Sequence, residues 1–497
     1  MALMSPLRST PVRLALLILA LSLAPLARAA SEREEAWYVV MMGDQRVGWM
    51  QSVEEREEDR IRTSSEVKLS IARGGMALSI SMLSRSVETA EAEPISMETV
   101  LELGAAPTRT RYEFKDDTVT ITTEAMGQKS VSEQPRPGGD WLPPAAAANY
   151  LKERLDAGAT EVTVATIEPL VGLQPTYSTL RLLEKTTIEA LGKRIPALKW
   201  SVEQAAVQGD AVQYTDLDGV PVRMEMDLGV LSMTIIASEK ELALSPLEPA
   251  EIMANTLVKP DRPIQRPRHT TTAVYRLSVP DGDMPEIPTQ GPQRAERIDD
   301  RAVRLTVDIN NPAVAPDADD PRWLDASSMI DAEDDSIVEL TRRALRGAPA
   351  DPAARAERLR AFVHDYMDLK NLGVGLATAT QACQTREGDC TEHGVLLAAM
   401  LRADGIPARV ATGLLYIDEF IGAEQIFGYH MWSQALLTVD GAPRWVDFDA
   451  TLPGDNRTDA THIALSTSAL EDGALINSMA AMAPVFGRLK IEVESIE

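Results

Sequence analysis

The first half of the chain repeats one pattern, in which short segments of alternating polar and apolar residues are separated by two-residue turns. The segment VKLSI, Val67–Ile71, shows the alternation, and Asp218-Gly219 shows the turn. Alternation with a period of two buries one side of a strand and exposes the other side to water. Dipeptides such as Asp-Gly close tight hairpins because they tolerate a positive φ. The pattern predicts a large antiparallel β-sheet with one solvated face.

Most of the predicted strands come in pairs around such turns. They are Trp37–Met42 and Gln45–Met50 around Gly43-Asp44, Val67–Ile71, Ala77–Leu83, Thr110–Phe114 and Thr118–Thr122 around Asp116-Asp117, and Gln213–Leu217 and Val220–Met226 around Asp218-Gly219. Ala145–Ala157 is predicted as a short helix between the two halves of this region. His, Cys and acidic residues form no catalytic pattern here, so residues 30–245 are predicted to be a β-rich binding or spacing module.

The chain has 497 residues, of which 44% are hydrophobic and 25% are charged. This composition is typical of globular proteins, and the length is enough for roughly two to four domains. The 75 acidic and 49 basic residues give a net charge of −26. A nucleic-acid-binding surface needs clustered positive charge, so no nucleic-acid partner is expected.

The N-terminal residues show the three parts of a secretory signal peptide. Arg8 and Arg13 precede the apolar run Leu14–Ala24, and Ala27-Arg28-Ala29 supplies small residues for cleavage. The apolar run is shorter than the ~20 residues that a membrane-spanning helix needs. We therefore predict that residues 1–29 are a signal peptide, that the mature protein is periplasmic or secreted, and that it keeps no membrane span. An uncleaved N-terminal anchor is the alternative.

Seven prolines lie between residues 260 and 292. Prolines at this spacing interrupt helices and central strands, so residues 246–320 are predicted to be a proline-rich linker with short strands, one of them at Ala273–Val279. The last domain is then predicted to span residues 321–497. In it Ile337–Leu345 is a predicted helix, and Asp351-Pro352 supplies the cap and the first-turn proline of another.

Only two cysteines occur, Cys383 and Cys390, which is too few for a disulfide framework. Cys390 opens the segment CTEHGVLLAAMLRAD, whose residues favour a helix that stops at Gly405. The unpaired N–H groups and the dipole at a helix N-terminus favour an anion, which increases the thiolate fraction of a cysteine. The position of Cys390 is therefore that of a nucleophile.

A nucleophilic cysteine also needs a base and a group that orients the base. Tyr429–Val439 alternates as a strand, Asp440-Gly441 forms a turn, and Arg444–Phe448 can return beside the first strand. In this hairpin His430, near the start of one strand, and Asp449, after the end of the next, come close together. The chain thus supplies a nucleophile, a general base and an orienting carboxylate, which is the set that a thiol acyl-transfer enzyme requires.

These motifs resemble the transglutaminase-like superfamily in their order and gaps. They are Gly388-Asp389-Cys390, Gly405–Arg409, His430-Met431-Trp432 and Trp445 to Thr451, within residues 333–453. The resemblance implies an α+β protein with a papain-like C-terminal core, in which the helix that carries Cys390 packs on an antiparallel sheet. It also implies that Cys390 attacks an acyl group, that His430 moves the proton and that Asp449 holds His430. The spacing from Trp445 favours Asp449 over Asp447, the alternative carboxylate.

The chain departs from the family in two respects. Asp449-Ala450-Thr451 stands where members commonly have Asp-Pro-Thr, which removes no catalytic group. The calcium-regulated, multidomain layout of animal transglutaminases is not visible, and no cofactor is expected. A metal site built from Cys383, Cys390, Glu392 and His393 is a less favoured alternative, because the C-x6-C-x2-H spacing matches no common zinc site. In the favoured interpretation Glu392 is a solvated acid at the helix start, and His393 packs beside the site.

Other residues near the motifs have weaker assignments. Cys383 can form a disulfide with Cys390 in an oxidising compartment, or it can remain a free thiol in the cleft wall, which we favour. The Cys390 backbone N–H is the expected oxyanion donor, with Gln384 and Gln381 as weak candidates for the second donor. Trp432 is predicted to form a cleft or core wall, with a weaker assignment to substrate binding. The remaining histidines have no matching partner and are assigned core or surface positions; they are His269, His364 and His462.

The predicted function is acyl transfer by a Cys-His-Asp triad, most readily the hydrolysis of a peptide or amide through a thioester. Hydrolysis is favoured because water is abundant outside the cell and no sequence feature indicates a pocket for an acceptor lysine. Protein-crosslinking transamidation is the second prediction. A catalytically silent envelope scaffold is the alternative of another class. The expected partners are a protein or peptide substrate and an envelope partner for the β-rich region.

Overall fold

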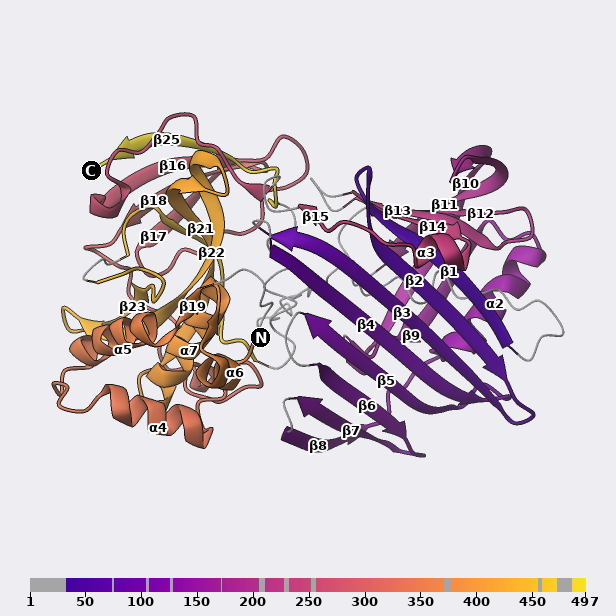
Figure 1. The fold of residues 1–497 in the computed structure, drawn as a ribbon, viewed down its shortest axis with the longest axis horizontal. Helices are drawn as coiled ribbons and strands as arrows, with labels where there is room; N and C mark the ends of the chain where they lie inside the picture. The colour runs from indigo at the N-terminus through magenta and orange to yellow at the C-terminus, as the bar shows by residue number, and fades with distance from the viewer. Residues whose placement is uncertain are drawn as a thin grey trace, which may run out of the picture.

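The computed structural model describes residues 33–73, 76–103, 107–125, 128–170, 172–204, 211–227, 232–251, 256–370, 377–454, 458–471 and 485–497. It is a mixed protein of helices and antiparallel sheets, with a β-rich N-terminal region and a C-terminal region that holds all but two of the labelled helices (Figure 1). The predicted signal peptide lies outside the described residues. Within the described part, no helix combines the length and hydropathy that a membrane crossing requires.

The β-rich region forms one largely antiparallel sheet, in which strands that follow one another in the chain also lie side by side. The exception is the pair β1 and β14, which are neighbours in the sheet although they are far apart in the chain. Its elements are β1 (Arg33–Met42), β2 (Gln45–Arg56), β3 (Arg60–Arg73), β4 (Met76–Thr89), β5 (Pro94–Leu103), β6 (Thr108–Phe114), β7 (Thr118–Ala125), β8 (Gln128–Pro135), α2 (Pro144–Asp156), β9 (Glu161–Ile167), β10 (Pro175–Ala190), β11 (Lys193–Gln204), β12 (Ala211–Thr215), β13 (Pro221–Asp227), β14 (Ser232–Ser238), α3 (Lys240–Ala243) and β15 (Ala250–Glu251). The short β15 pairs with β3 in parallel.

The predicted strands are confirmed, and the alternation works as expected. In β3 the side chains of Val67, Leu69 and Ile71 are buried, while Lys68 between them is exposed. Local pattern did not predict the joint, where β1 pairs with β14 and brings Trp37 opposite Ser238. This pairing makes a single sheet of the strand series β1 to β8 and β9 to β14.

The predicted helix between the two halves is also confirmed as α2. It begins at a proline, whose missing N–H costs nothing at this position. The carboxylate of Glu88, on β4, accepts hydrogen bonds from the N–H groups of Ala145 (3.0 Å) and Ala146 (2.9 Å). A carboxyl group thus takes over the capping of the first turn and ties α2 to the sheet.

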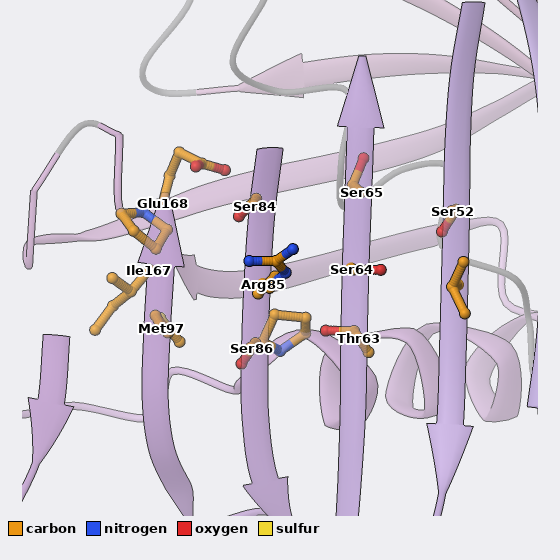
Figure 2. A pocket seen from close by; sticks show the side chains of 13 residues that line it. Ser52, Thr63, Ser64, Ser65, Ser84, Arg85, Ser86, Met97, Ile167 and Glu168 are labelled. Atoms are coloured by element: carbon orange, nitrogen blue, oxygen red, sulfur yellow. The ribbon is translucent and has the colours of Figure 1, made fainter. Parts of the chain in front are cut away.

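A small pocket of about 40 Å³ lies between this sheet and the segment before α2. Figure 2 shows hydroxyl side chains from three neighbouring strands along it, among them Ser52, Ser65 and Ser86. Glu168 lies at its edge and is largely buried. The volume is that of a few water molecules, so we read the pocket as hydrated interior.

The segment predicted as a linker does contain short strands, but they belong to a folded sheet. β16 (Thr272–Ser278), β17 (Gln293–Asp299) and β18 (Ala302–Asp308) join β25 (Lys490–Ile496) in the order β17-β18-β16-β25. In β16, Ala273, Tyr275 and Leu277 are fully buried. The linker interpretation is therefore corrected: the prolines bound the strands, and pairing with a distant strand buries the apolar residues between them.

The rest of the C-terminal region is a second four-stranded sheet covered by helices. Its elements are η3 (Pro267–His269), η4 (Pro321–Trp323), α4 (Asp335–Ala344), α5 (Pro352–Tyr366), β19 (Leu369–Lys370), α6 (Ala379–Thr385), β20 (Glu387–Gly388), α7 (Cys390–Ala403), β21 (Ala408–Phe420), β22 (Ala423–Val439), β23 (Ala442–Phe448) and β24 (His462–Ser468). The strand order is β23-β22-β21-β24. The predicted helices and the predicted hairpin around Asp440-Gly441 are all present.

Two apolar cores lie against this second sheet. Helix α7 is buried along most of its length and packs on β21 and β22, with α4, α5 and α6 around it. Farther along β21, Leu414 and Tyr416 pack instead against the sheet of β16, β18 and β25. Figure 1 shows the helices on one side and the β16 sheet on the other, with β21 and β22 between them. The central sheet thus fixes α7 against β22, which carries His430.

Candidate active site

Helix α7 begins at Cys390, as the sequence predicts, and its start is tightly capped. Asp389 is the N-cap, and its Oδ1 accepts a hydrogen bond of 2.8 Å from the Thr391 N–H. Glu392 completes a capping box, because its Oε2 accepts a 2.8 Å hydrogen bond from the Asp389 N–H. Cys390 itself is partly exposed. The thiol therefore lies at an accessible helix N-terminus whose position is fixed from both sides.

Glu392 is not the solvated acid that the sequence predicts, since its side chain is completely buried. Its Oε1 accepts a second backbone hydrogen bond, from Ala377 (2.8 Å). Burial, and then the charge of Asp389, raise the pKa of Glu392 to about 8. Gly388 has a φ of +149°, and a Cβ added there would lie 2.4 Å from the Glu392 side chain. The glycine of the Gly-x-Cys motif thus makes room for the buried carboxyl.

His430 and Asp449 meet across the predicted hairpin. The Nε2 atom of His430, on β22, lies 2.8 Å from Oδ2 of Asp449, which directly follows β23. The other carboxylate oxygen, Oδ1, accepts hydrogen bonds from the backbone N–H (2.8 Å) and the hydroxyl (2.7 Å) of Thr451. The alternative carboxylate, Asp447, accepts a 2.6 Å hydrogen bond from Gln434 instead. Of the two aspartates, Asp449 is the one that contacts His430.

The charges of this group reinforce one another. Burial alone would lower the pKa of His430, but the negative charges of Asp449 and Cys390 outweigh it and raise the pKa to about 10. Burial would likewise raise the pKa of Asp449, yet the imidazoles of His430 and His462 hold it well below its usual value. The influence of Cys390 on the pKa of His430 indicates that the thiol lies near the imidazole. Because Nε2 is taken by Asp449, Nδ1 is the nitrogen left for the thiol, and a protonated imidazole could pair there with a thiolate.

His462 is a member of this group that the sequence analysis missed. Its Nε2 lies 3.3 Å from the same Oδ2 of Asp449, and its side chain is fully buried. A signal was present in the sequence, because Asp-Ala-Thr occurs at residues 449–451 and again at 459–461, directly before His462. Both copies form the same turn, with Thr461 donating to Asp459 as Thr451 donates to Asp449. His462 does occupy a core position, one of the two positions predicted for it, but the prediction that it has no matching partner is wrong.

His430, Asp449 and His462 offer ligand atoms within 4.8 Å of one another, so they are also the group that could hold a metal. Tetrahedral zinc with bonds of ~2.0 Å keeps its ligand atoms more than ~3 Å apart. The 2.8 Å between His430 Nε2 and Asp449 Oδ2 is instead a hydrogen-bond length. A metal here would have to separate the two groups and take the nitrogen that orients the imidazole. In the metal alternative from the sequence, Glu392 is already engaged by two backbone N–H groups.

Three weaker assignments have different outcomes. Trp432 is 1% exposed, so it offers no surface to a substrate, and the assignment to substrate binding is corrected. Its indole stacks on the His430 ring (centroids 6.0 Å apart) and meets the His462 ring edge-on (5.3 Å). Gln384 is exposed on α6, while Gln381 is buried and its side-chain oxygen accepts from the Thr378 N–H, as the N3 residue of another capping box. No contact assigns either amide to an oxyanion.

The two cysteines are both free, so no disulfide joins Cys383 to Cys390. Cys383 is buried in α6 and its Sγ lies 4.0 Å from the carbonyl oxygen of Ser336. Burial raises the pKa of its thiol. It is thus a free thiol in the wall that faces α4, and only Cys390 is both partly exposed and near enough to an imidazole to raise its pKa.

Comparison with known proteins finds a family model that matches part of this site. Residues 339–450 match the model of the transglutaminase-like superfamily core. The matched segment contains Cys390, His430 and Asp449 and ends at residue 450. No curated protein matches the chain.

Several solved structures are similar to parts of this chain at low scores. They are a β-barrel-like protein of the domain of unknown function DUF1849 from Brucella abortus (12% identity, TM-score 0.32, covering 44% of this chain and 97% of that one), a proposed cysteine protease from Cytophaga hutchinsonii (14%, 0.26, 46% and 84%), and the periplasmic domain of TgpA from Pseudomonas aeruginosa bound to ethylmercury (14%, 0.24, 37% and 91%). TM-scores this low carry no conclusion about function. The family match applies to its own segment: the C-terminal region of this chain holds a transglutaminase-like core.

Proposed function

We propose that this protein is an exported thiol enzyme that transfers acyl groups from a peptide or amide, most readily to water. The observation that carries the proposal is the hydrogen bond of 2.8 Å between His430 and Asp449, beside a cysteine at the N-terminus of a buried helix. A partly exposed thiol and a raised imidazole pKa together favour a thiolate–imidazolium pair. Such a pair is the activated nucleophile of thiol acyl transfer.

In the first half of the reaction the Cys390 thiolate attacks the carbonyl carbon of the substrate, and a C–S bond forms. The negative charge moves to the carbonyl oxygen, where the backbone N–H of Cys390 and the helix dipole can stabilise it. His430 then donates its Nδ1 proton to the leaving amine, and the C–N bond breaks. The products of this half are a free amine, a thioester on Cys390 and a neutral His430.

In the second half a water molecule gives its proton to Nδ1 of His430 and attacks the thioester carbon. The C–S bond breaks, the carboxylic acid leaves, and the thiolate–imidazolium pair is restored. Asp449 stays ionised throughout and keeps Nε2 of His430 oriented. A primary amine in place of water would give transamidation, which is the runner-up.

The location and partners are part of the proposal. The signal peptide predicted at residues 1–29 would send the protein to the periplasm or outside the cell. The substrate would be a protein or peptide, and the β-rich region would bind an envelope partner. If the triad is silent, that binding role remains as a scaffold function.

The test is the alkylation rate of Cys390 by iodoacetamide between pH 5 and 10, followed by peptide mass mapping. We expect labelling at pH 6 at least about tenfold faster than that of a free thiol, whose pKa is ~8.5. Replacing His430 by Ala should remove this acceleration. Cys383 in the same molecule is the internal control, because it is buried and should label slowly in both proteins.

An ordinary thiol profile for Cys390 in the wild-type protein would contradict the enzyme and favour the scaffold. If the acceleration is present, trapped acyl-enzyme can be released in ¹⁸O-labelled water with a primary amine added. Incorporation of ¹⁸O into the product then indicates hydrolysis, and incorporation of the amine indicates transamidation.

A further inference from the structure

We propose that His462 is a positioning residue of this active site, a second imidazole that holds the Asp449 carboxylate in place for His430. The inference rests on the proposed function, because a positioning role needs a reaction to serve. It concerns a residue outside the segment that matches the family model, residues 339–450.

The contacts leave the Asp449 carboxylate with four donors. Oδ1 accepts the backbone N–H and the hydroxyl of Thr451, and Oδ2 accepts from both imidazoles. The distances to Oδ2 are 2.8 Å from His430 and 3.3 Å from His462. Removing His462 would leave Oδ2 with His430 alone, so the carboxylate could rotate away from the imidazole that it orients.

His462 is in turn held from its other side. Its Nδ1 lies 3.2 Å from the Asp459 carbonyl oxygen and 3.7 Å from the carboxylate Oδ1 of the same residue. The other oxygen of that carboxylate accepts a hydrogen bond of 2.7 Å from Arg268. The side chains of His462 and Asp459 are 0% and 2% exposed, so this contact is closed to water.

Read from Arg268 inward, the groups alternate in charge: guanidinium, Asp459 carboxylate, His462, Asp449 carboxylate, His430 and the thiolate. Burial lowers the pKa of His462, but the two carboxylates outweigh it and raise the pKa to about 9. Buried ions are tolerated when each is paired and hydrogen bonded. Asp447 is a further anion that senses the charge of His462, and the remaining edge of the ring meets Trp432.

A histidine that only filled the core would not need this arrangement. Two identical Asp-Ala-Thr turns bring Asp449 and Asp459 to its two nitrogens. The Asp449 carboxylate lies 3.3 Å from Nε2, whereas Nδ1 lies 3.2 Å from the Asp459 carbonyl oxygen and 3.7 Å from the Asp459 carboxylate. The outer carboxylate is fixed by a residue of the segment that precedes β16, far away in the sequence. These contacts fix the orientation of the Asp449 carboxylate, and that carboxylate in turn fixes the orientation of His430.

The test compares His462→Gln with His462→Met in the full-length protein. The two side chains are similar in size, but only glutamine can donate a hydrogen bond to Asp449. We expect the alkylation rate of Cys390 at pH 7 to fall about tenfold in His462→Met, which corresponds to about one pKa unit in the thiolate equilibrium. The upper step of the pH profile, where His430 loses its proton, should also move below about 10. His462→Gln should keep the alkylation rate within about twofold of the wild type, and it should leave the upper step of the pH profile at its wild-type position.

A second variant and a control protect the test against a folding defect. Asp459→Asn weakens the hold on His462 from the outside and should lower the rate in the same direction, by about threefold. His364→Gln is the matched control, since this histidine contacts the backbone carbonyl of Ala450 (3.1 Å) and should leave the profile unchanged. Circular dichroism identifies any variant that does not fold.

The outcomes separate this inference from the proposed function. A wild-type protein without the accelerated profile overturns the proposed function, and the inference with it. An accelerated wild type with folded His462→Met and His462→Gln proteins that behave alike overturns the inference only, because packing would then explain His462. If His462→Met does not fold, an unchanged profile in Asp459→Asn overturns the inference, and a lowered rate supports it.

Discussion

The β-rich region and the active site bury their carboxyl groups with opposite results. In the β-rich region, burial raises the pKa of Glu168 to about 8 and that of Glu88 to about 7. In the active site Asp449 is buried at least as deeply, yet its pKa is held well below the usual value. The hydrogen-bond partners differ: backbone N–H groups in the first case (Figure 2 shows Glu168 beside the hydroxyl-lined pocket), and two imidazoles in the second.

Glu392 shows that the partner matters more than the region. It lies two residues after Cys390, but its donors are neutral N–H groups, and its pKa rises to about 8 like those of the β-rich region. The two N–H groups do not offset the desolvation of this carboxylate, whereas the two imidazoles at hydrogen-bond distance offset that of Asp449. Depth of burial therefore does not tell whether an acid is charged.

Replacing one acid of each kind by its uncharged amide, Asp449→Asn and Glu168→Gln, should give the largest difference between the two regions. Asp449→Asn removes the anion that two buried imidazoles share, so we expect the free energy of unfolding to fall by about 3 kcal/mol or more. Glu168→Gln should cost less than about 1 kcal/mol at pH 7, because that carboxyl is already uncharged. Urea denaturation followed by tryptophan fluorescence measures both. Equal losses in the two variants would show that both acids carry the same charge.

A pH series should sharpen the comparison within the β-rich region. The folded pKa values of Glu88 and Glu168, about 7 and about 8, lie above the unfolded value of 4.5, so the folded state binds protons more tightly. The contribution of these two carboxyl groups to stability is then greatest below about pH 4.5, and it is lost as the pH rises towards 8. Because one pKa unit corresponds to about 1.4 kcal/mol, the loss should be several kcal/mol and at most about 8 kcal/mol, measured as faster hydrogen exchange in β4 after correction for the intrinsic rate. The double variant Glu88→Gln/Glu168→Gln should flatten this dependence, and a slope that persists in it would assign the effect to other groups.

The smallest effect is expected where an ion pair faces solvent. Arg85 contacts Glu98 at 2.9 Å on the outside of the sheet, with 53% of the arginine side chain exposed. Water screens this pair, and Arg109 also reaches Glu98 (3.2 Å). Arg85→Gln should therefore change the free energy of unfolding by less than about 0.5 kcal/mol. A drop in melting temperature beyond ~5 °C would mean that surface pairs hold this sheet as strongly as buried pairs hold the active site.

The sequence pattern correctly predicted the elements whose formation depends on residues close together in the chain. The hairpins of the β-rich region, α2 and the start of α7 follow from alternation, turn dipeptides and caps, which act within a few residues. The pairing of β1 with β14 and of β16 with β25 is not encoded in that way. Both join segments about 200 residues apart, and the prolines around β16 made its neighbourhood resemble a linker.

The same limit explains what was found and what was missed in the site. Cys390 and His430 were predicted because each stands at a defined position in a local motif, and their placement depends on one helix and one hairpin. His462 belongs to none of the family motifs, its one local signal is the repeated Asp-Ala-Thr before it, and its partner Asp449 precedes it by 13 residues. Glu392 was misjudged because an acid in the first turn of a helix is usually solvated, and only the glycine before it hinted at burial.

The pairing of β16 with β25 has a consequence for how the charge series is completed. Asp261 accepts a hydrogen bond from Val493, 232 residues away, and Arg268 lies in the same segment, just before β16. Contacts between such distant segments form slowly, because a long loop must close before they gain anything. The outermost guanidinium of the charge series, Arg268, is therefore in place only where these distant segments have met. The buried carboxylate of Asp459 gains its counter-ion from tertiary assembly and not from its own hairpin or turn.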